Sequence, residues 1–443
     1  MRTKYEQELL ELRRKTDRIS QSSDDTLIDE PPPPPEGAKA WLFMVSAFLI
    51  EALLWGFPMS FGIFAAYYKD HENFRNDRYI PVIGTLTTGI AFLGAPIVVP
   101  IAARYHSKQR QMIWAGWAIC VASLIAASFA TKVWHLLVAQ GIAYGLGFLI
   151  LYYAMLSMLN EWFDARRGLA YGILFGAAGI SGTGLPFLVQ ILLTKFGFAA
   201  TLRAYAVALV LIIGPTLPLC RGRLSKVQRC KVEYKVLKNP VLWALLFSNL
   251  FQGLAFFLPG IYLPTYAYTL SISPARATLL LCLLNGSQIL GQVLLGWLSD
   301  WVNSFFLLVV STLSSAIIAG LLWYMATGFM HLLAFSILFG FFAGGYSVLW
   351  PRWAKVLIDH EPTELWIYGL LAFQRGVGNI AAGPISVALI KMTAKFAKEN
   401  EAASFRALIY FVVITLIVSS LGALSYFCPQ IPAQHKRFIT QRK

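Results

Sequence analysis

Charged side chains are scarce in this sequence. Only 13% of its 443 residues are charged and 57% are hydrophobic, whereas a soluble globular protein carries about 25% charged residues. Too little polar surface remains to face water. Long apolar runs without charges recur along the whole chain, as in segments that lie in a lipid bilayer. The composition therefore excludes an ordinary soluble domain and predicts a membrane protein with the lipid bilayer as its solvent.

Signals for metal, disulfide or nucleotide chemistry are also missing. The five cysteines form no CxxC pair and the six histidines are scattered, so neither a disulfide framework nor a metal site is predicted. No Walker loop, HExxH motif or nucleophile elbow occurs, which argues against an ATP-driven pump and against an enzyme. We expect no cofactor, no metal ligand and no catalytic residue.

Twelve apolar runs come close to or exceed the roughly 20 residues needed to cross a bilayer. Helix is the expected conformation because lipid offers the backbone no hydrogen-bond partners. The sequence therefore predicts an all-α membrane protein with twelve transmembrane helices. We expect them at 39–68, 80–103, 111–131, 134–160, 168–194, 201–219, 239–268, 276–299, 304–326, 331–358, 364–391 and 404–427.

The basic residues are distributed unevenly around these runs. Of the 37 lysines and arginines, 25 lie in the tails and loops on the side of both termini, and 11 lie on the opposite side. This bias predicts that both termini are cytoplasmic, and we expect the plasma membrane. We ascribe the net charge of +15 to contact with anionic lipid and expect no nucleic-acid partner.

The longest polar break divides the runs six and six. The expected parts are a disordered cytoplasmic tail with a polyproline spacer (1–38), a six-helix bundle (39–219), a basic cytoplasmic loop (220–238), a second six-helix bundle (239–427) and a cytoplasmic tail (428–443).

Glycines reveal an internal repeat with a single offset of 199 residues. Two such halves, parallel and related by an axis along the membrane normal, place a substrate site between them near mid-membrane. We therefore expect pseudo-symmetric halves. The matching pairs are Gly141 with Gly340, Gly145 with Gly344, Gly179 with Gly378 and Gly184 with Gly383.

Two ionisable side chains, Glu51 and Arg375, lie deep within predicted spans. Each is about 17 Å from the cytoplasmic end of its span, near the middle of a core about 30 Å thick. Charges at that depth are costly, so they are retained mainly where they face a cavity or a partner. One interpretation is that Arg375 binds an anionic group and Glu51 takes part in proton coupling. The other is structural, with Arg375 bonded to backbone carbonyls and Glu51 held neutral against a neighbour.

Amide side chains form two polar stripes in the second predicted bundle. Asn285, Gln288 and Gln292 share one helical face, and Asn249 and Gln252 share another. Because amides in lipid are costly, both stripes should face the interior, either toward a ligand or toward neighbouring helices. With aromatic candidates added, the predicted substrate-binding residues are Arg375, Asn249, Gln252, Asn285, Gln288, Gln292, Tyr144 and Tyr346.

Three stretches resemble the fungal branch of the monocarboxylate transporter family, within the major facilitator superfamily. They are residues 36–41 (EGAKAW), 162–172 (WFDARRGLAYG) and 373–379 (FQRGVGN). The resemblance implies a major facilitator fold and a small organic substrate. It also implies gating or motif roles, rather than substrate contact, for Arg166, Arg167, Asp300, Gly179 and Gly378.

The same comparison shows departures from the animal lactate carriers. They have a lysine after Phe-Pro in the first span, where this chain has Met59, and an acid and an arginine in the eighth span, where this chain has amides. Simple lactate–proton symport is therefore not expected. Our hypothesis is a secondary active transporter of a carboxylate or secondary metabolite that works by alternating access, with protons as a coupling partner and efflux favoured by the resemblance alone. Import of a vitamin or organic acid, and a non-transporting sensor with the same fold, stay open as alternatives.

Overall fold

The computed structural model describes residues 36–72, 74, 79–223, 232–358, 361–394 and 401–427. The expected N-terminal tail with its spacer, part of the basic loop, and the expected C-terminal tail lie outside the described residues. Within the described residues, every regular element is helical. The α-helices are α2 (Ala38–Asp70), α3 (Ile80–Leu93), α4 (Ala95–Arg104), α5 (Gln109–Ala127), α6 (Val133–Leu136), α7 (Tyr144–Trp162), α8 (Arg167–Ala208), α9 (Pro240–Phe256), α10 (Leu258–Thr269), α11 (Pro274–Leu298), α12 (Ser304–Ile318), α13 (Phe329–Gly344), α14 (Trp350–Leu357), α15 (Glu361–Ala394) and α16 (Arg406–Ser420).

The predicted spans agree with these helices to within a few residues. Nine helical runs among the described residues are long and apolar enough to cross a membrane, and α3 with α4 forms a tenth that bends by 47°. Two expected spans fall within a single continuous run, Arg167–Leu219, and α15 covers the expected eleventh span. The structure is thus consistent with twelve spans and confirms the all-helical prediction.

Glycine and proline mark the breaks inside the longer runs. Gly197 adopts φ 76° and ψ 175°, a conformation that favours glycine, and it divides the run that begins with α8 into two helices. Between α3 and α4, Pro96 near the start of α4 lacks the amide hydrogen needed to continue the helical ladder. Other helices begin at side-chain caps: Asn239 accepts from the amide of Val241 at the start of α9.

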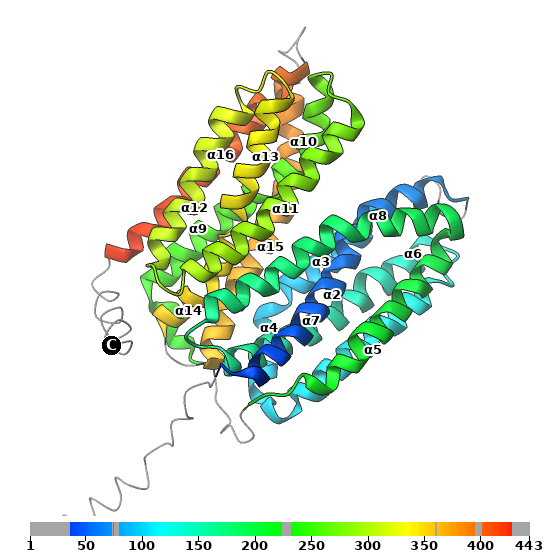
Figure 1. Cartoon of the computed structure of the whole chain (residues 1–443), viewed down its shortest axis with the longest axis vertical. Helices are drawn as coiled ribbons and strands as arrows, with labels where there is room; N and C mark the ends of the chain where they lie inside the picture. The colour runs from blue at the N-terminus through cyan, green and yellow to red at the C-terminus, as the bar shows by residue number, and fades with distance from the viewer. Residues whose placement is uncertain are drawn as a thin grey trace, which may run out of the picture. The chain divides into compact units, whose positions relative to one another are not determined.

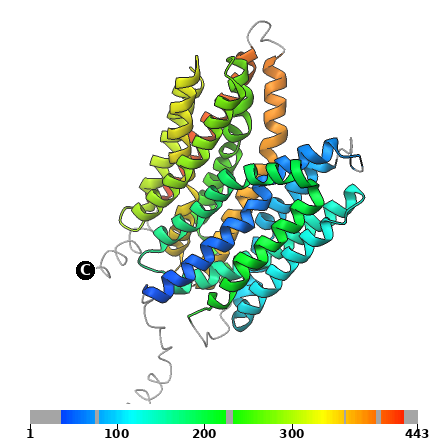
Figure 2. The same ribbon diagram turned by 45° about the vertical axis from the view of Figure 1, so that its right-hand side comes forward.

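The helices form two groups, α2–α8 and α9–α16, which lie on opposite sides in both views (Figures 1 and 2). The groups meet where α8 packs against α11 and where α15 packs against α3 and α4. Within the groups, Gly141 lies against Leu86 of α3, and its repeat partner Gly340 lies against Leu284 of α11. Because α3 and α11 are the second helical spans of their halves, these packing contacts are equivalent, as the repeat predicts.

Candidate functional site

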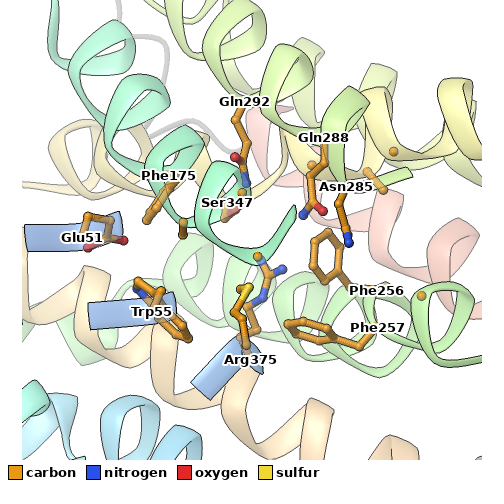
Figure 3. A pocket seen from close by; sticks show the side chains of 18 of the residues that line it. Glu51, Trp55, Phe175, Phe256, Phe257, Asn285, Gln288, Gln292, Ser347 and Arg375 are labelled. Atoms are coloured by element: carbon orange, nitrogen blue, oxygen red, sulfur yellow. The ribbon is translucent and has the colours of Figure 1, made fainter. Parts of the chain in front are cut away.

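A cavity of about 180 Å³, the central cavity, lies between the two groups of helices. Residues from α2, α3, α7 and α8 form one side, and residues from α9, α10, α11, α13, α14 and α15 form the other. Figure 3 shows Trp55 and Arg375 facing the amides of Asn285, Gln288 and Gln292 across the cavity. A site between two halves is what the internal repeat predicts, and both deep charges line this space.

Arg375 brings a positive charge into the cavity wall. Its side chain is buried, and its guanidinium carbon lies 4.1 Å from the ring centre of Phe256, 5.7 Å from that of Phe257 and 5.5 Å from that of Trp350. Aromatic faces attract a cation, but they do not neutralise it. Among the described residues Arg375 has no acidic partner. Nor does it bond to backbone carbonyls there, as its structural interpretation required. The guanidinium is therefore available to an anionic ligand.

Glu51 brings the opposite charge from α2. The side chain is fully buried and lines the same cavity, and neither carboxyl oxygen has a hydrogen-bond partner among the described residues. Three tyrosines, Tyr152, Tyr153 and Tyr368, lie within electrostatic reach of it. Glu51 and Arg375 form no ion pair with each other. An uncompensated buried carboxylate is costly, so the neutral, protonated carboxyl fits these surroundings best.

The amide side chains of α11 that line the cavity have polar atoms without hydrogen-bond partners among the described residues. Asn285 and Gln288 line the cavity and make no hydrogen bond within the described part of the chain, and Gln292 has a buried carbonyl oxygen without a partner. Buried amides normally have partners, so groups left open in a cavity wall point to a ligand. The structure brings these three amides together with Arg375 and Glu51 in the wall of one cavity.

Four of the predicted substrate-binding residues lie outside the wall of the central cavity. Asn249 donates to the backbone oxygen of Leu371 at 2.5 Å, which fixes α9 to α15, and Gln252 is buried on the same helix. Tyr144 donates to the oxygen of Leu54 at 3.0 Å, and Tyr346 bonds with the hydroxyl of Ser248 at 2.9 Å. These four side chains pack between helices, so we do not include them in the proposed site.

Aromatic side chains that the sequence analysis did not select form much of the wall. Their helical spacing resembles that of ordinary packing residues, so only the tertiary arrangement distinguishes them. Their presence makes the cavity apolar on most sides, with a few polar groups, as in typical sites for small molecules. They are Trp55, Phe92, Phe175 and Phe257.

A second cavity, of about 630 Å³, adjoins the central one. The two share six wall residues: Trp55, Met59, Phe92, Gly182, Phe257 and Asn285. The second cavity is lined by the end of α8's first helix (to Gln190), the beginning of α11 (from Thr278) and exposed residues such as Phe187. The combined space therefore opens toward the membrane face where these segments end.

Charged residues close the opposite end. We call Asp164, Arg167, Asp300, Arg352, Lys355 and Glu364 the ion-pair layer. Four ion pairs among the described residues join its members: Arg167 with Glu364, Lys355 with Asp164, Arg352 with Asp300, and Arg167 with Asp164 at 3.7 Å. The first two connect the α7–α8 region to α14 and α15, so they link the two groups of helices. Burial disfavours the charge of Asp164, but the cations of Arg167 and Lys355 outweigh this and lower the pKa of its carboxyl.

Asp300 makes a further connection between the two groups of helices. Its carboxylate accepts hydrogen bonds from the backbone amides of Gly168 (2.8 Å) and Leu169 (3.0 Å) at the start of α8. A carboxylate is favoured there because a helix N-terminus carries partial positive charge and free amide donors. Asp300 follows α11 of the other group, so it acts as a cap supplied from outside the helix that it caps.

The remaining predicted motif residues occupy different surroundings. Arg166 is exposed, and its guanidinium nitrogen lies 3.9 Å from the carboxylate of Glu36. Gly179 lies in the central cavity wall against Ile289, and Gly378 packs closely against Leu250 of α9. Arg167 and Asp300 therefore sit at the boundary between the groups. Their partners Arg352 and Glu364 were not predicted, although both occur at helix ends on the predicted cytoplasmic side.

Comparison with known proteins decides the family. A family model described as Major Facilitator Superfamily matches residues 44–365. The chain belongs to this superfamily. Members of this family are transporters rather than enzymes, and the chain is accordingly a multi-pass membrane transporter of a small molecule.

Several curated relatives of this superfamily member are fungal proteins. The chain is 28% identical over 358 residues to the MFS-type transporter pynF of Aspergillus niger, covering 80% of this chain and 82% of the relative. It is 27% identical over 358 residues to the aspyridones efflux protein apdF of Emericella nidulans, covering 80% and 72%. Among solved structures it resembles the major facilitator transporter FucP in the outward conformation, with a TM-score of 0.61 and 14% identity, covering 86% and 99%. That likeness supports the fold.

Proposed function

We propose that the protein exports an organic anion, a carboxylate or carboxylate-bearing secondary metabolite, from a fungal cell in a proton-coupled manner. The observation that carries this proposal is the unpaired guanidinium of Arg375, buried in an aromatic wall of the cavity between the two halves. A buried cation without an acidic partner is costly unless a ligand supplies the anion. Fungal relatives include a protein named for the efflux of aspyridones, which favours export.

Alternating access follows from the two ends of the cavity. In this structure the ion-pair layer closes one end, and the second cavity opens toward the other. Transport requires the opposite state too, in which the ion pairs between the two groups separate and the helices around the second cavity close. Because the ion pairs and the Asp300 cap that join the two groups are discrete contacts, the two states are alternative sets of contacts rather than a gradual deformation.

Glu51 is the proposed proton carrier. Its carboxyl faces three tyrosines and has no hydrogen-bond partner in the described structure, so in this state it is best accommodated with a proton. Opening of the other end would admit water beside it and favour release of that proton. Exchange of an outgoing anion for an incoming proton links the two charges of the cavity in one cycle.

Two further features complete the proposal. We place the protein in the monocarboxylate porter branch on the strength of the motifs at 36–41, 162–172 and 373–379. The excess of basic residues on the side of both termini supports a cytoplasmic location for the termini. We propose the plasma membrane, where an exporter can release its substrate to the medium.

The proposal is tested first by comparing metabolites in the medium of cells with and without the protein. An organic acid enriched by the protein is then assayed for flux in proteoliposomes. Arg375→Gln should abolish flux at unchanged protein abundance, Arg375→Lys should retain part of it, and Arg276→Gln, at the start of α11 outside both cavities, should behave as wild type. Undiminished flux in Arg375→Gln refutes the assigned role, and binding without flux in the wild type supports a sensor instead.

A further inference from the structure

The wall of the second cavity carries polar groups but no charge. None of the described residues that line it is Asp, Glu, His, Lys or Arg. Its polar side chains come from four different helices: Thr88 of α3, Thr183 and Gln190 of α8, Thr278 and Asn285 of α11, and Asn379 of α15. A second anionic or cationic group of a ligand would find no counter-charge there. The wall therefore suits a neutral part of a molecule.

Three side-chain oxygen atoms in this wall are available as hydrogen-bond acceptors. The hydroxyl of Thr88 donates to the backbone oxygen of Gly84 at 3.1 Å, and that of Thr183 donates to Gly179 at 2.9 Å. With their hydrogens engaged, both oxygens have only lone pairs to offer. The side-chain oxygen of Asn379 is buried and has no partner within the described residues. All three oxygen atoms are therefore acceptors that receive no hydrogen bond from a described residue.

Asn379 stands in a fixed relation to Arg375. Both side chains come from α15, four residues apart, so they share one helix face about 6 Å apart along its axis. Arg375 lines the central cavity, Asn379 lines the second, and the two cavities share six residues including Asn285. A ligand whose acidic group reaches Arg375 extends toward Asn379 if it is one ring or more in length.

We propose that the second cavity is a binding subsite for a neutral, donor-bearing part of the transported acid. The substrate class is an amphipathic organic acid with a ring-containing body that carries hydroxyl or N–H groups at least one helix turn from the carboxylate. The rings lie against Trp55, Phe92 and Phe257, and the donors bond to Asn379, Thr183 and Thr88. This inference rests on the proposed role of Arg375, and it explains why the space beyond Arg375 is larger than a small acid requires.

The test uses three acids that differ at one position: cinnamate, 4-hydroxycinnamate and 4-methoxycinnamate. Their affinities for the purified full-length protein in lipid nanodiscs are measured by ligand-observed NMR titration. The wild type should bind 4-hydroxycinnamate on the order of tenfold more tightly than cinnamate, as expected for one added hydrogen bond to a buried acceptor. The methoxy compound, which has no donor, should not gain this advantage.

Variants separate the subsite from the acid site. Asn379→Leu and Thr183→Val should each reduce the preference for the hydroxylated acid and leave cinnamate binding unchanged, which also shows that the variant is folded. The matched control Thr194→Val, on the exposed surface of α8, should keep the wild-type preference. If Asn379→Leu is unstable, Thr183→Val provides the same comparison.

The outcomes distinguish two failures. Suppose that Arg375→Gln weakens the binding of all three acids. The acid site then stands, but the subsite is refuted if the wild type shows no preference for the hydroxylated acid, or if both subsite variants keep that preference. If Arg375→Gln leaves all three affinities unchanged, the proposed function itself fails. A preference that disappears in the subsite variants and persists in Thr194→Val supports the subsite.

Discussion

The hydroxyl oxygens of Tyr152 on α7 and Tyr368 on α15 lie 3.1 Å apart and form a buried hydrogen bond between the two halves. Both rings line the central cavity. Tyr171, at the beginning of α8, packs against Tyr368 with ring centres 5.7 Å apart and interacts electrostatically with Arg167 and Glu364. The tyrosine pair therefore lies between the cavity and the ion-pair layer, where it contributes to closing that end.

Tyr368→Phe should weaken this closure while the phenylalanine ring keeps the cavity wall in place. The change removes one neutral hydrogen bond, worth about 1 kcal/mol or about fivefold in an equilibrium constant. Cys282 lines the second cavity and is partly exposed in this state, so its rate of labelling should report how often that cavity is open. In a background with Cys230 and Cys428 replaced by serine, the rate of maleimide labelling of Cys282 should fall by up to about fivefold. An unchanged rate argues against a gating role.

The buried ion pair of Arg167 with Glu364 should matter more. Breaking a buried pair leaves one charge unpaired, at a cost of about 3–5 kcal/mol to the state that contains it. Arg167→Gln should therefore reduce Cys282 labelling about tenfold or more. The double variant Arg167→Gln/Glu364→Gln leaves no unpaired charge and should be affected less than the single variant. If the double variant is as impaired as the two single changes added together, the residues do not act as a pair.

The all-helical architecture with many spans could be predicted from the sequence, because lipid imposes a simple rule of length and apolarity. The same rule made Glu51 and Arg375 conspicuous, and both lie in the cavity wall. Asn249 is a residue whose surroundings helical periodicity cannot decide. Its helical face points inward as expected, but whether it meets a cavity or the backbone oxygen of Leu371 depends on the neighbouring helix.

Which charged residues pair with each other in the ion-pair layer could not be predicted from the sequence, for a related reason. Arg167 and Glu364 are separated by 197 positions and meet only when α8 and α15 are placed side by side. Hydropathy locates such residues at helix ends but says nothing about which ends are adjacent. The aromatic wall raises the same difficulty, because Phe256 on a helix looks like a packing residue until the neighbouring Arg375 is in place.

Gly172 should be sensitive to a single methyl group. A Cβ atom there would lie 2.6 Å from the backbone oxygen of Gln292 on α11, closer than packing allows. Gly172→Ala should therefore destabilise this state by about 1–3 kcal/mol, as overpacking usually does. Gly184→Ala is the matched control on α8, because a Cβ there meets nothing within 4 Å. Thermal unfolding midpoints of the two purified variants give the comparison, and equal midpoints contradict the close helix contact.

Glu51→Gln should separate transport from its dependence on protons. Glutamine has nearly the same shape and stays neutral, so it reproduces the protonated carboxyl that fits the partnerless, fully buried position. The charged and titratable groups around Glu51 are Tyr152, Tyr153 and Tyr368, with Arg375 on the same cavity wall. Exchange of the organic acid across proteoliposome membranes should persist in the variant, whereas uphill flux driven by a pH gradient should be lost. The conservative variant Glu51→Asp should keep some response to the gradient. Gradient-driven flux that survives in Glu51→Gln would assign the coupling proton to another group.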